Sequence, residues 1–242
     1  MAAPYFYVVG ATGGVGSALC RMIHQRSMGR LYMVGRDLSE MHKLNEQLGG
    51  AHVVVAEPTD ASNPDQIAAA MQKAPDELKG LAYCVGSITL KPLKRCTHAD
   101  FADAFTLNCV SAAFAVKEAQ ANLARNSGSV VLFSTVASQV GFANHAVVAS
   151  AKGAVQGLTL SLAAELAPHI RVNCVAPSLS KTKMAKSMTS GKMGEAVASS
   201  HPMKRLGEPE DLARAALFLL DPENSWVTGQ VLPVDGGRSS IA

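Results

Sequence analysis

The sequence lacks a charge excess of either sign and a long uninterrupted apolar run. Its 242 residues include 22 Lys and Arg against 19 Asp and Glu, a formal net charge of +3. Binding to a phosphate backbone needs a stronger basic excess, so we expect no nucleic-acid partner. The most aliphatic candidate helix, residues 109–123, is interrupted by Lys117, Glu118, Gln120 and Asn122. It falls short of the ~18 apolar residues that cross a bilayer, and we do not expect an integral membrane protein.

Paired cysteine motifs are also absent. The five cysteines are an odd number at scattered positions: Cys20, Cys84, Cys96, Cys109 and Cys174. This pattern indicates neither a disulfide framework nor a zinc site, and we predict no bound metal. The first residues show no basic segment followed by a long apolar one, so we expect no leader peptide. Unpaired thiols are typical of the cytoplasm or another reducing compartment, an organelle matrix included.

Short apolar runs alternate with helical patterns along the whole sequence, without a linker or a low-complexity segment. The runs predict strands at residues 5–10, 31–34, 52–56, 81–85, 129–134, 170–175 and 231–234. Such alternation is the βαβ signature of a parallel sheet with helices on both faces. We therefore predict one α/β domain over residues 1–242, a doubly wound Rossmann-type sheet of about seven strands.

A glycine-rich turn follows the first predicted strand. It reads Gly10-Ala11-Thr12-Gly13-Gly14-Val15-Gly16 and leads into an amphipathic helix. Glycines let the chain turn sharply and let a pyrophosphate approach the helix N-terminus, where unpaired N–H groups favour anions. The spacing fits Gly10-x3-Gly14-x-Gly16 or Gly10-x2-Gly13-x2-Gly16, and a plain tight turn is the alternative. With the later motifs, we predict a dinucleotide site that includes Gly10, Thr12, Gly14, Val15 and Gly16.

The end of the second predicted strand indicates which dinucleotide binds. A site specific for NAD places a carboxylate there, on the ribose 2′-hydroxyl, whereas this sequence has Gly35-Arg36. A guanidinium binds a phosphate through two parallel hydrogen bonds, so we predict NADP(H) in preference to NAD. The alternative is a solvated Arg36 beside Asp37. Asp60 and Ala61, just past the third strand, are placed to meet the adenine.

With motifs farther along, the sequence resembles the short-chain dehydrogenase/reductase family, specifically the single-domain branch that includes the β-ketoacyl carrier-protein reductases. Beyond the glycine turn, the resemblance rests on Thr59-Asp60, Asn108 in 107–110, and the segments 151–159, 171–177, 205–211, 228–230 and 234–237. It covers essentially the whole chain. The resemblance implies hydride transfer between a nicotinamide and a carbonyl or alcohol, and assembly as a homodimer or homotetramer.

The family's catalytic set of Asn, Ser, Tyr and Lys is only partly present. Asn108 and Lys152 match, and Thr135 stands where the serine is expected, with Ser134 as the fallback. The residue four before Lys152, where the family has tyrosine, is Val148. Residues four apart share a helix face, so in the family the lysine lowers the pKa of that phenol. Valine has no proton to give, and loss of a positioned acid costs ~10²–10⁴ in rate.

Two cofactor motifs differ as well. Cys84-Val85-Gly86 stands where the family usually reads Asn-Ala-Gly, and Pro177-Ser178 stands where it usually reads Pro-Gly. The resemblance still assigns Gly86, Lys152 and Pro177 to the cofactor site and Thr182 to the nicotinamide carboxamide. The departures therefore gather at the nicotinamide end.

Three functions remain open. The first is an NADP(H)-dependent reductase with a substitute acid. His145, seven residues before Lys152, is the candidate, unless it lies in the preceding loop or caps the helix. The second is an inactive pseudoenzyme that serves as a nucleotide-binding sensor or a structural subunit. The third is an interaction module without a dinucleotide, which the retained glycines, Arg36 and Asp60 argue against.

The substrate side is marked by one segment in which Lys181, Lys183, Lys186 and Lys192 alternate with Met184, Met188 and Met193. Such a lid could grip an acyl chain and an anionic carrier, so a small carbonyl compound or an acyl thioester is the expected substrate. An ordinary amphipathic helix with a solvated basic face is the alternative. Small residues in the predicted helix 148–167 favour close packing with a partner helix, and 103–124 is the second predicted interface helix.

Overall fold

The computed structural model describes residues 3–50, 53–73 and 75–241, and over these residues seven strands form one parallel sheet in the order β3-β2-β1-β4-β5-β6-β7. The strands are β1 (Tyr5–Val9), β2 (Arg30–Val34), β3 (Val53–Val55), β4 (Leu78–Tyr83), β5 (Ser129–Phe133), β6 (Arg171–Pro177) and β7 (Val231–Val234). The order reverses between β1 and β4, which makes the sheet doubly wound. The predicted α/β architecture is confirmed.

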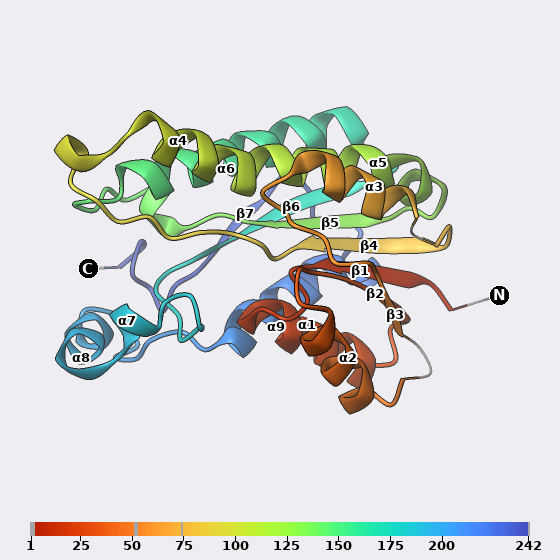
Figure 1. Ribbon diagram of the computed structural model, residues 1–242, viewed down its shortest axis with the longest axis horizontal. Helices are drawn as coiled ribbons and strands as arrows, with labels where there is room; N and C mark the ends of the chain where they lie inside the picture. The colour runs from red at the N-terminus through yellow and green to blue at the C-terminus, as the bar shows by residue number, and fades with distance from the viewer. Residues whose placement is uncertain (1–2, 51–52, 74, 242) are drawn as a thin grey trace.

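Helices cover both faces of the sheet (Figure 1). One face carries α1 (Gly14–Gln25), α2 (Leu38–Gln47) and α9 (Pro209–Leu220), and the other carries α3 (Pro64–Gln72), α4 (His98–Phe105), α5 (Ser111–Arg125) and α6 (Ala146–Leu166). Two short helices, α7 (Lys186–Thr189) and α8 (Gly191–Ser199), lie beside these layers. They sit near the carboxyl end of β6, where they are placed to cover a site.

Alternation along the strands explains the two cores. In β1, Tyr5, Tyr7 and Val9 pack toward α3 and α5, whereas Phe6 and Val8 pack toward α1, α2 and α9. All five residues are buried, as expected for a strand covered on both faces. The two faces of the sheet therefore have separate apolar cores.

Several predicted strand boundaries differ from the structure, and the largest differences are in β4 and β6. β4 begins at Leu78 rather than Leu81, because Leu78 already pairs with Tyr5 of β1 despite the polar Lys79 and the small Gly80. It ends at Tyr83, so Cys84 and Val85 belong to the loop that follows. β6 extends to Pro177, and His52 of the predicted third strand lies outside the described residues. β4 begins where it pairs with β1, and β6 continues to Pro177, which pairs with Val234 of β7.

The two predicted interface helices are present with other limits. The first predicted helix, residues 103–124, is part of a helical run over His98–Arg125, and the second is α6. Both runs are long and apolar enough to cross a membrane, but core helices meet the same criteria. Both pack against the sheet here (Figure 1). They are therefore weak evidence for a membrane span.

Candidate functional site

A cavity of about 460 Å³ opens at the carboxyl ends of β4, β5 and β6, beside the point where the strand order reverses. Its walls come from the loops after these strands, the start of α6, and α7 and α8. Open α/β sheets bind their ligands at such a switch point. The structure brings seven predicted site residues to this cavity: Val15, Gly86, Thr135, His145, Lys152, Pro177 and Thr182.

The glycine turn lies at the adjoining strand end. Gly10 has a positive φ of +82°, and a Cβ on Gly16 would collide with the carbonyl oxygen of Gly10. α1 begins at Gly14 after Gly13, which supplies no side-chain hydrogen bond to the helix, and its first turn contains no acidic residue. The N-terminal N–H groups of α1 are thus suited to an anion. Thr182 lies close by, since a Cβ on Gly14 would be 3.2 Å from Thr182 Cγ2.

Arg36 is exposed at the end of β2, where no acidic partner holds it. The Asp37 carboxylate accepts a hydrogen bond from Glu40 N (3.0 Å) and caps α2. Within the described residues, no carboxylate lies within ion-pair distance of Arg36. The alternative, in which Arg36 is simply solvated beside Asp37, therefore gains no support from an ion pair between them.

Asp60 and Ala61 lie in the loop after β3. A hydrogen bond from Ser62 N to Asp60 Oδ1 (3.0 Å) lowers the pKa of Asp60, and the charge of Arg36 lowers it further. The carbonyl oxygen of Ala61 accepts a hydrogen bond from Ser111 Oγ (2.7 Å), which ties the loop to α5. The structure thus holds Asp60 as a carboxylate on the side of the cleft where Arg36 lies.

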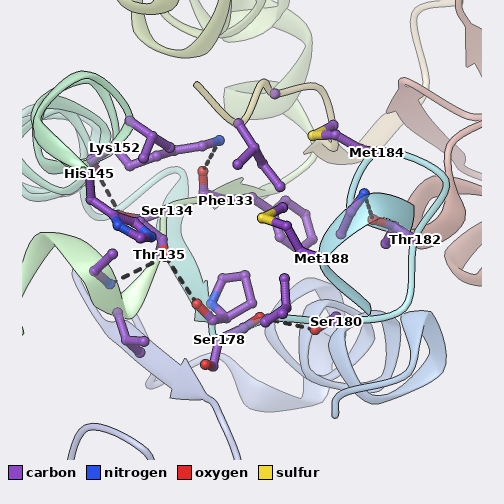
Figure 2. Close-up of a pocket in the computed structure, with 18 of the residues that line it drawn as sticks. Phe133, Ser134, Thr135, His145, Lys152, Ser178, Ser180, Thr182, Met184 and Met188 are labelled. Atoms are coloured by element: carbon purple, nitrogen blue, oxygen red, sulfur yellow. Dashed lines mark hydrogen bonds between the residues drawn. The ribbon is translucent and has the colours of Figure 1, made fainter. Parts of the chain in front are cut away.

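Lys152 is the charged side chain at the centre of the site (Figure 2). It is 7% exposed, and its Nζ donates to the carbonyl oxygen of Phe133 at the end of β5 (2.7 Å). Burial lowers the pKa of Lys152 to about 8. Ser134 Oγ donates to the Lys152 carbonyl oxygen (2.7 Å) and so fixes this turn of α6 against β5.

Asn108 lies behind Gly86, in a π-helical segment (Thr106–Val110) between α4 and α5. Its Nδ2 donates to the Ala104 carbonyl oxygen (2.8 Å), while its Oδ1 is buried without a partner. A Cβ on Gly86 would be 2.9 Å from Lys152 Nζ and 3.0 Å from Asn108 Oδ1. The glycine therefore leaves space that a cationic donor and an unpaired acceptor both face, which fits a hydroxyl group or a water.

Thr135 and Ser134 are neighbours with different surroundings. Ser134 is 3% exposed, and its hydroxyl also accepts a hydrogen bond from Gln156 Nε2 (3.0 Å). Thr135 is half-buried, and its Oγ1 donates to the carbonyl oxygen of Pro177 (3.2 Å). Thr135 is thus the better placed of the two to meet a ligand, as the sequence predicts, and Ser134 stabilises α6.

Val148 lies on α6 one turn before Lys152 and lines the cavity. All four tyrosines of the chain lie in the strands of the sheet, where they are at most 5% exposed: Tyr5, Tyr7, Tyr32 and Tyr83. They belong to the core on the α3 and α5 face. The cavity surface one turn before the lysine is therefore aliphatic.

His145 does not share a helix face with Lys152. α6 begins at Ala146, so His145 occupies the N-cap position, as in the alternative raised above. Its ring packs against Phe142 at 5.4 Å between centroids, and its Nδ1 lies 2.8 Å from the Ala143 carbonyl oxygen. His145 precedes the first helical residue, so it is not on the helix face that carries Lys152. It still lines the cavity.

The outer wall of the cavity is apolar. Met184 and Met188 (Figure 2) and Met193 lie on the α7 and α8 side, and Ile88 and Leu90 line it from the loop after β4. Met184 is 51% exposed and Met193 is 60% exposed. Lys181 pairs with Glu208 (2.6 Å), while the other predicted lysines are exposed. The methionines therefore face the site and the lysines face outward.

One pair in the cavity wall escapes sequence analysis. His201 is 2% exposed, with Nε2 2.8 Å from Ser178 Oγ and Nδ1 2.7 Å from the Val197 carbonyl oxygen. Ser178 is visible in the sequence only as a departure from the family's Pro-Gly. Twenty-three residues separate the two partners, so no local spacing could have paired them.

The residues present fit a bound dinucleotide. The glycine turn has no room for a side chain at Gly16, the N-terminus of α1 is uncapped, and Asn108 Oδ1 is an unpartnered acceptor beside Lys152. Metal binding has no comparable basis, because the described residues contain no cluster of three His, Cys, Asp or Glu side chains that could hold an ion. All five cysteines are free thiols.

Comparisons with known proteins agree with this geometry. Residues 10–239 match a family model described as enoyl-(acyl carrier protein) reductase. A tropinone reductase homolog of Arabidopsis thaliana is 34% identical over 238 residues, which cover 95% of this chain and 90% of that protein. L-xylulose reductase of Bos taurus is 32% identical over 235 residues, which cover 95% and 94%.

Solved structures give the same picture. A short-chain type dehydrogenase/reductase from Mycobacterium ulcerans superposes with a TM-score of 0.89 at 28% identity, covering 99% of this chain and 90% of that one. ElxO with NADP bound superposes with a TM-score of 0.88 at 26% identity, covering 98% and 99%. The chain belongs to the short-chain dehydrogenase/reductase family of oxidoreductases.

Proposed function

We propose that this protein is an NADP(H)-dependent oxidoreductase that transfers hydride between the nicotinamide and a carbonyl or alcohol, with Val148 where the family has tyrosine. The observation that carries the proposal is the position of Lys152. Its ammonium is buried at the carboxyl edge of the sheet, beside an unpartnered Asn108 Oδ1 and in the same cleft as the glycine turn. A buried lysine is costly in a scaffold and useful in a site that binds hydroxyl groups.

NADP(H) is favoured over NAD by the end of β2. Arg36 is exposed, without an ion-pair partner among the described residues, and no carboxylate stands where a ribose 2′-hydroxyl would be bound. Charged, bidentate hydrogen bonds to a 2′-phosphate fit this arrangement. Gly10, Thr12, Gly14, Val15 and Gly16 would surround the pyrophosphate, and Asp60 and Ala61 would meet the adenine. Gly86, Lys152, Pro177 and Thr182 would hold the nicotinamide half.

The bound cofactor would supply the hydride, and the chain's own residues orient the substrate and manage the proton. Lys152 and Asn108 present a donor and an acceptor to the space above Gly86, and Thr135 presents a hydroxyl group to the cavity. Positioning of donor and acceptor lowers the barrier by several kcal/mol, which sustains turnover without a phenol. The proton has to come from another cavity group, for which His145 is one candidate.

The cavity suits an apolar carbonyl compound or an acyl thioester. Its outer wall carries the flexible, polarisable side chains of Met184, Met188 and Met193, which adapt to an alkyl chain. Exposed lysines on the same segment would attract an anionic carrier. We also propose assembly as a homodimer or homotetramer through α5 and α6, because α6 exposes Gly157, where an added Cβ would meet nothing within 4 Å, and Leu160, which is 55% exposed.

A second candidate function is an inactive, nucleotide-binding family member that serves as a sensor or a structural subunit. The observation that favours it is Val148 itself, an aliphatic side chain at the cavity position one turn before Lys152. In that case the cofactor binds and is not consumed. For either form we propose a reducing compartment such as the cytoplasm, because the five cysteines are free thiols.

Deuterium transfer separates the two functions. Purified protein is incubated with NADPH deuterated at C4 and with ketones, quinones and β-ketoacyl thioesters, and the products are analysed by mass spectrometry. The proposal predicts an alcohol that carries the deuterium from C4 on its carbinol carbon, or, from a quinone, hydroquinone formed with equimolar oxidation of NADPH. NADPH binding without label transfer to any substrate would instead support the pseudoenzyme.

A further inference from the structure

The Ser178 and His201 pair is the second titratable feature of the cavity wall, and the steps assigned to Lys152 do not use it. Ser178 follows β6, and His201 follows α8. Both side chains line the 460 Å³ cavity, which also includes Lys152, Thr135 and Val148. Thr135 Oγ1 donates to the carbonyl oxygen of Pro177, the residue before Ser178, and Figure 2 shows Thr135 and Ser178 at this strand edge.

Hydrogen bonding fixes which atoms of His201 can exchange a proton. The Val197 carbonyl oxygen can only accept, so Nδ1 carries a proton in both the neutral and the charged ring. Nε2 therefore accepts a hydrogen bond from the Ser178 hydroxyl when the ring is neutral and donates one when it is charged. The pair thus has two proton arrangements along one hydrogen bond of 2.8 Å.

A second cavity of about 210 Å³ lies on the other side of the pair. Ser178, Leu179, Ser180 and His201 line both cavities, and the outer walls of the second include the exposed Arg205 and Arg214. Its inner wall includes Asp235, whose carboxylate accepts hydrogen bonds from Gly237 N (2.9 Å) and Ser239 N (2.7 Å).

The Asp235 carboxylate stays charged. Burial raises its pKa, but the hydrogen bonds from Ser239 and Gly237 and the charge of His201 outweigh this effect, so that the pKa of Asp235 is lowered overall. Charged groups lie around His201 in the walls of both cavities. Asp235 and Arg238 follow β7, and Lys152 lies across the first cavity. Across the second cavity lie Arg205, Asp211 and Arg214.

We propose that the Ser178 hydroxyl donates the proton to the substrate oxygen, and that His201 acts through it as the positioning residue and proton relay. This inference rests on the proposed reductase function. The carbonyl carbon accepts a hydride from the reduced nicotinamide, and the C=O π electrons move to oxygen, which takes the Ser178 proton. Ser178 Oγ takes the Nε2 proton of charged His201, the ring becomes neutral, and solvent restores its proton through the second cavity. The carbonyl is reduced by two electrons and NADPH is oxidised by two.

Substitution at Ser178 provides the sharpest test. Ser178→Gly installs the residue that the family usually has there, so it should fold, and it removes the hydroxyl together with its Cβ. We expect it to lower kcat by ~10²–10⁴, with NADPH affinity from fluorescence titration changed less than threefold. Ser178→Thr keeps a hydroxyl and should retain activity within about tenfold of the unmodified protein.

His201→Gln should also lower kcat and change the pH profile of kcat, because it removes the imidazole that supplies the Ser178 proton. The matched control is His169→Gln, which changes an exposed histidine beyond the far end of α6 and should leave both rate and pH profile unchanged. A readout without turnover is imidazole ¹⁵N NMR of the protein. It should show neutral His201 protonated at Nδ1, with an Nε2 signal that shifts in Ser178→Gly.

Each other outcome overturns a distinct statement. Equal turnover in Ser178→Gly and the unmodified protein would refute the role of Ser178. So would a loss of activity in His145→Ala that Ser178→Gly does not share. In both cases the proposed reductase function would stand. A neutral His201 protonated at Nε2 would refute the relay. If the unmodified protein binds NADPH but reduces no substrate, the proposed reductase function fails, and this inference fails with it.

Discussion

The two ends of the cleft hold their polar groups in opposite ways. At the adenosine end, Arg36 is exposed and Asp60 is part of a local turn, while the pyrophosphate would lie on main-chain groups of the glycine turn. At the nicotinamide end, Lys152 and His201 are buried, and each is held by hydrogen bonds to residues distant in sequence. The proposed cofactor site therefore rests on short local motifs, whereas the proposed chemistry rests on contacts that only the fold assembles.

The largest expected effect is at the glycine turn. Gly16→Ala places a Cβ against the Gly10 carbonyl oxygen, which forces the turn apart and costs ~1–3 kcal/mol of stability. We expect NADPH binding, measured by fluorescence titration, to weaken at least a hundredfold. Gly13→Ala is the matched variant, because Gly13 has an ordinary negative φ of −69°, and its effect should be much smaller. Equal NADPH affinity in Gly16→Ala and the unmodified protein would show that the turn does not bind the cofactor.

Lys152→Met should separate chemistry from binding at the other end. The substitution keeps the side-chain length and removes the ammonium that faces the space above Gly86. We expect a fall in kcat of ~10²–10⁴ and a loss of less than tenfold in NADPH affinity, because the adenosine half is untouched. Steady-state kinetics together with direct titration checks this prediction. An unchanged kcat in Lys152→Met would show that the ammonium takes no part in the reaction.

Arg36→Ala should have the opposite effect to Lys152→Met, because it should weaken cofactor binding more than it lowers kcat. A charged hydrogen bond contributes about 1.5–3 kcal/mol, so NADPH affinity should fall ~10–100-fold while NADH affinity stays the same. Arg26→Ala, an exposed arginine at the C-terminal end of α1, serves as the control. Equal losses for NADPH and NADH would mean that Arg36 does not read the 2′-phosphate.

A further effect of Lys152 is on how the stability of the fold depends on pH. Burial lowers the pKa of folded Lys152 to about 8 from 10.5, so between these pH values the unfolded chain binds more protons. Stability contributed by this group therefore rises from pH 8 to 10.5, by up to ~3 kcal/mol. Buried thiols such as Cys20, whose pKa is raised to about 12, act in the opposite direction.

The difference between the unmodified protein and Lys152→Met isolates that effect, because both contain the same thiols. Urea unfolding at pH 7.5 and pH 9.5 should show the unmodified protein gaining stability relative to Lys152→Met. A constant difference across this range would mean that the lysine is solvated in the folded protein.

Sequence patterns predict the sheet well, because their signals are local. The runs in β1 and β2 and the Asn63-Pro64 start of α3 are complete in a few residues, and Asn63 does cap the helix. Strand boundaries are predicted less well where pairing with a neighbouring strand sets them. Leu78, for example, belongs to β4 because it pairs with Tyr5 of β1. Of the two placements that the sequence leaves open for His145, the structure shows the one at the start of the helix, because α6 begins one residue after it.

The nicotinamide end was only partly predictable. Lys152, Thr135 and the methionines are recognisable by resemblance or composition, and the structure places all of them around the cavity. The unpartnered Asn108 Oδ1 and the pairing of Ser178 with His201 depend on three-dimensional contacts between segments that no spacing connects. In the proposed mechanism, such contacts would determine the protonation chemistry.

The most direct test of the account compares NADPH oxidation by the unmodified protein and by Val148→Tyr, side by side, over ketones, quinones and β-ketoacyl thioesters. The account predicts that the unmodified protein oxidises NADPH with at least one of these substrates, with its proton supplied by a group other than a phenol. If the unmodified protein binds NADPH and oxidises none of it while Val148→Tyr is active, the site is intact except for its acid, and the central claim is contradicted.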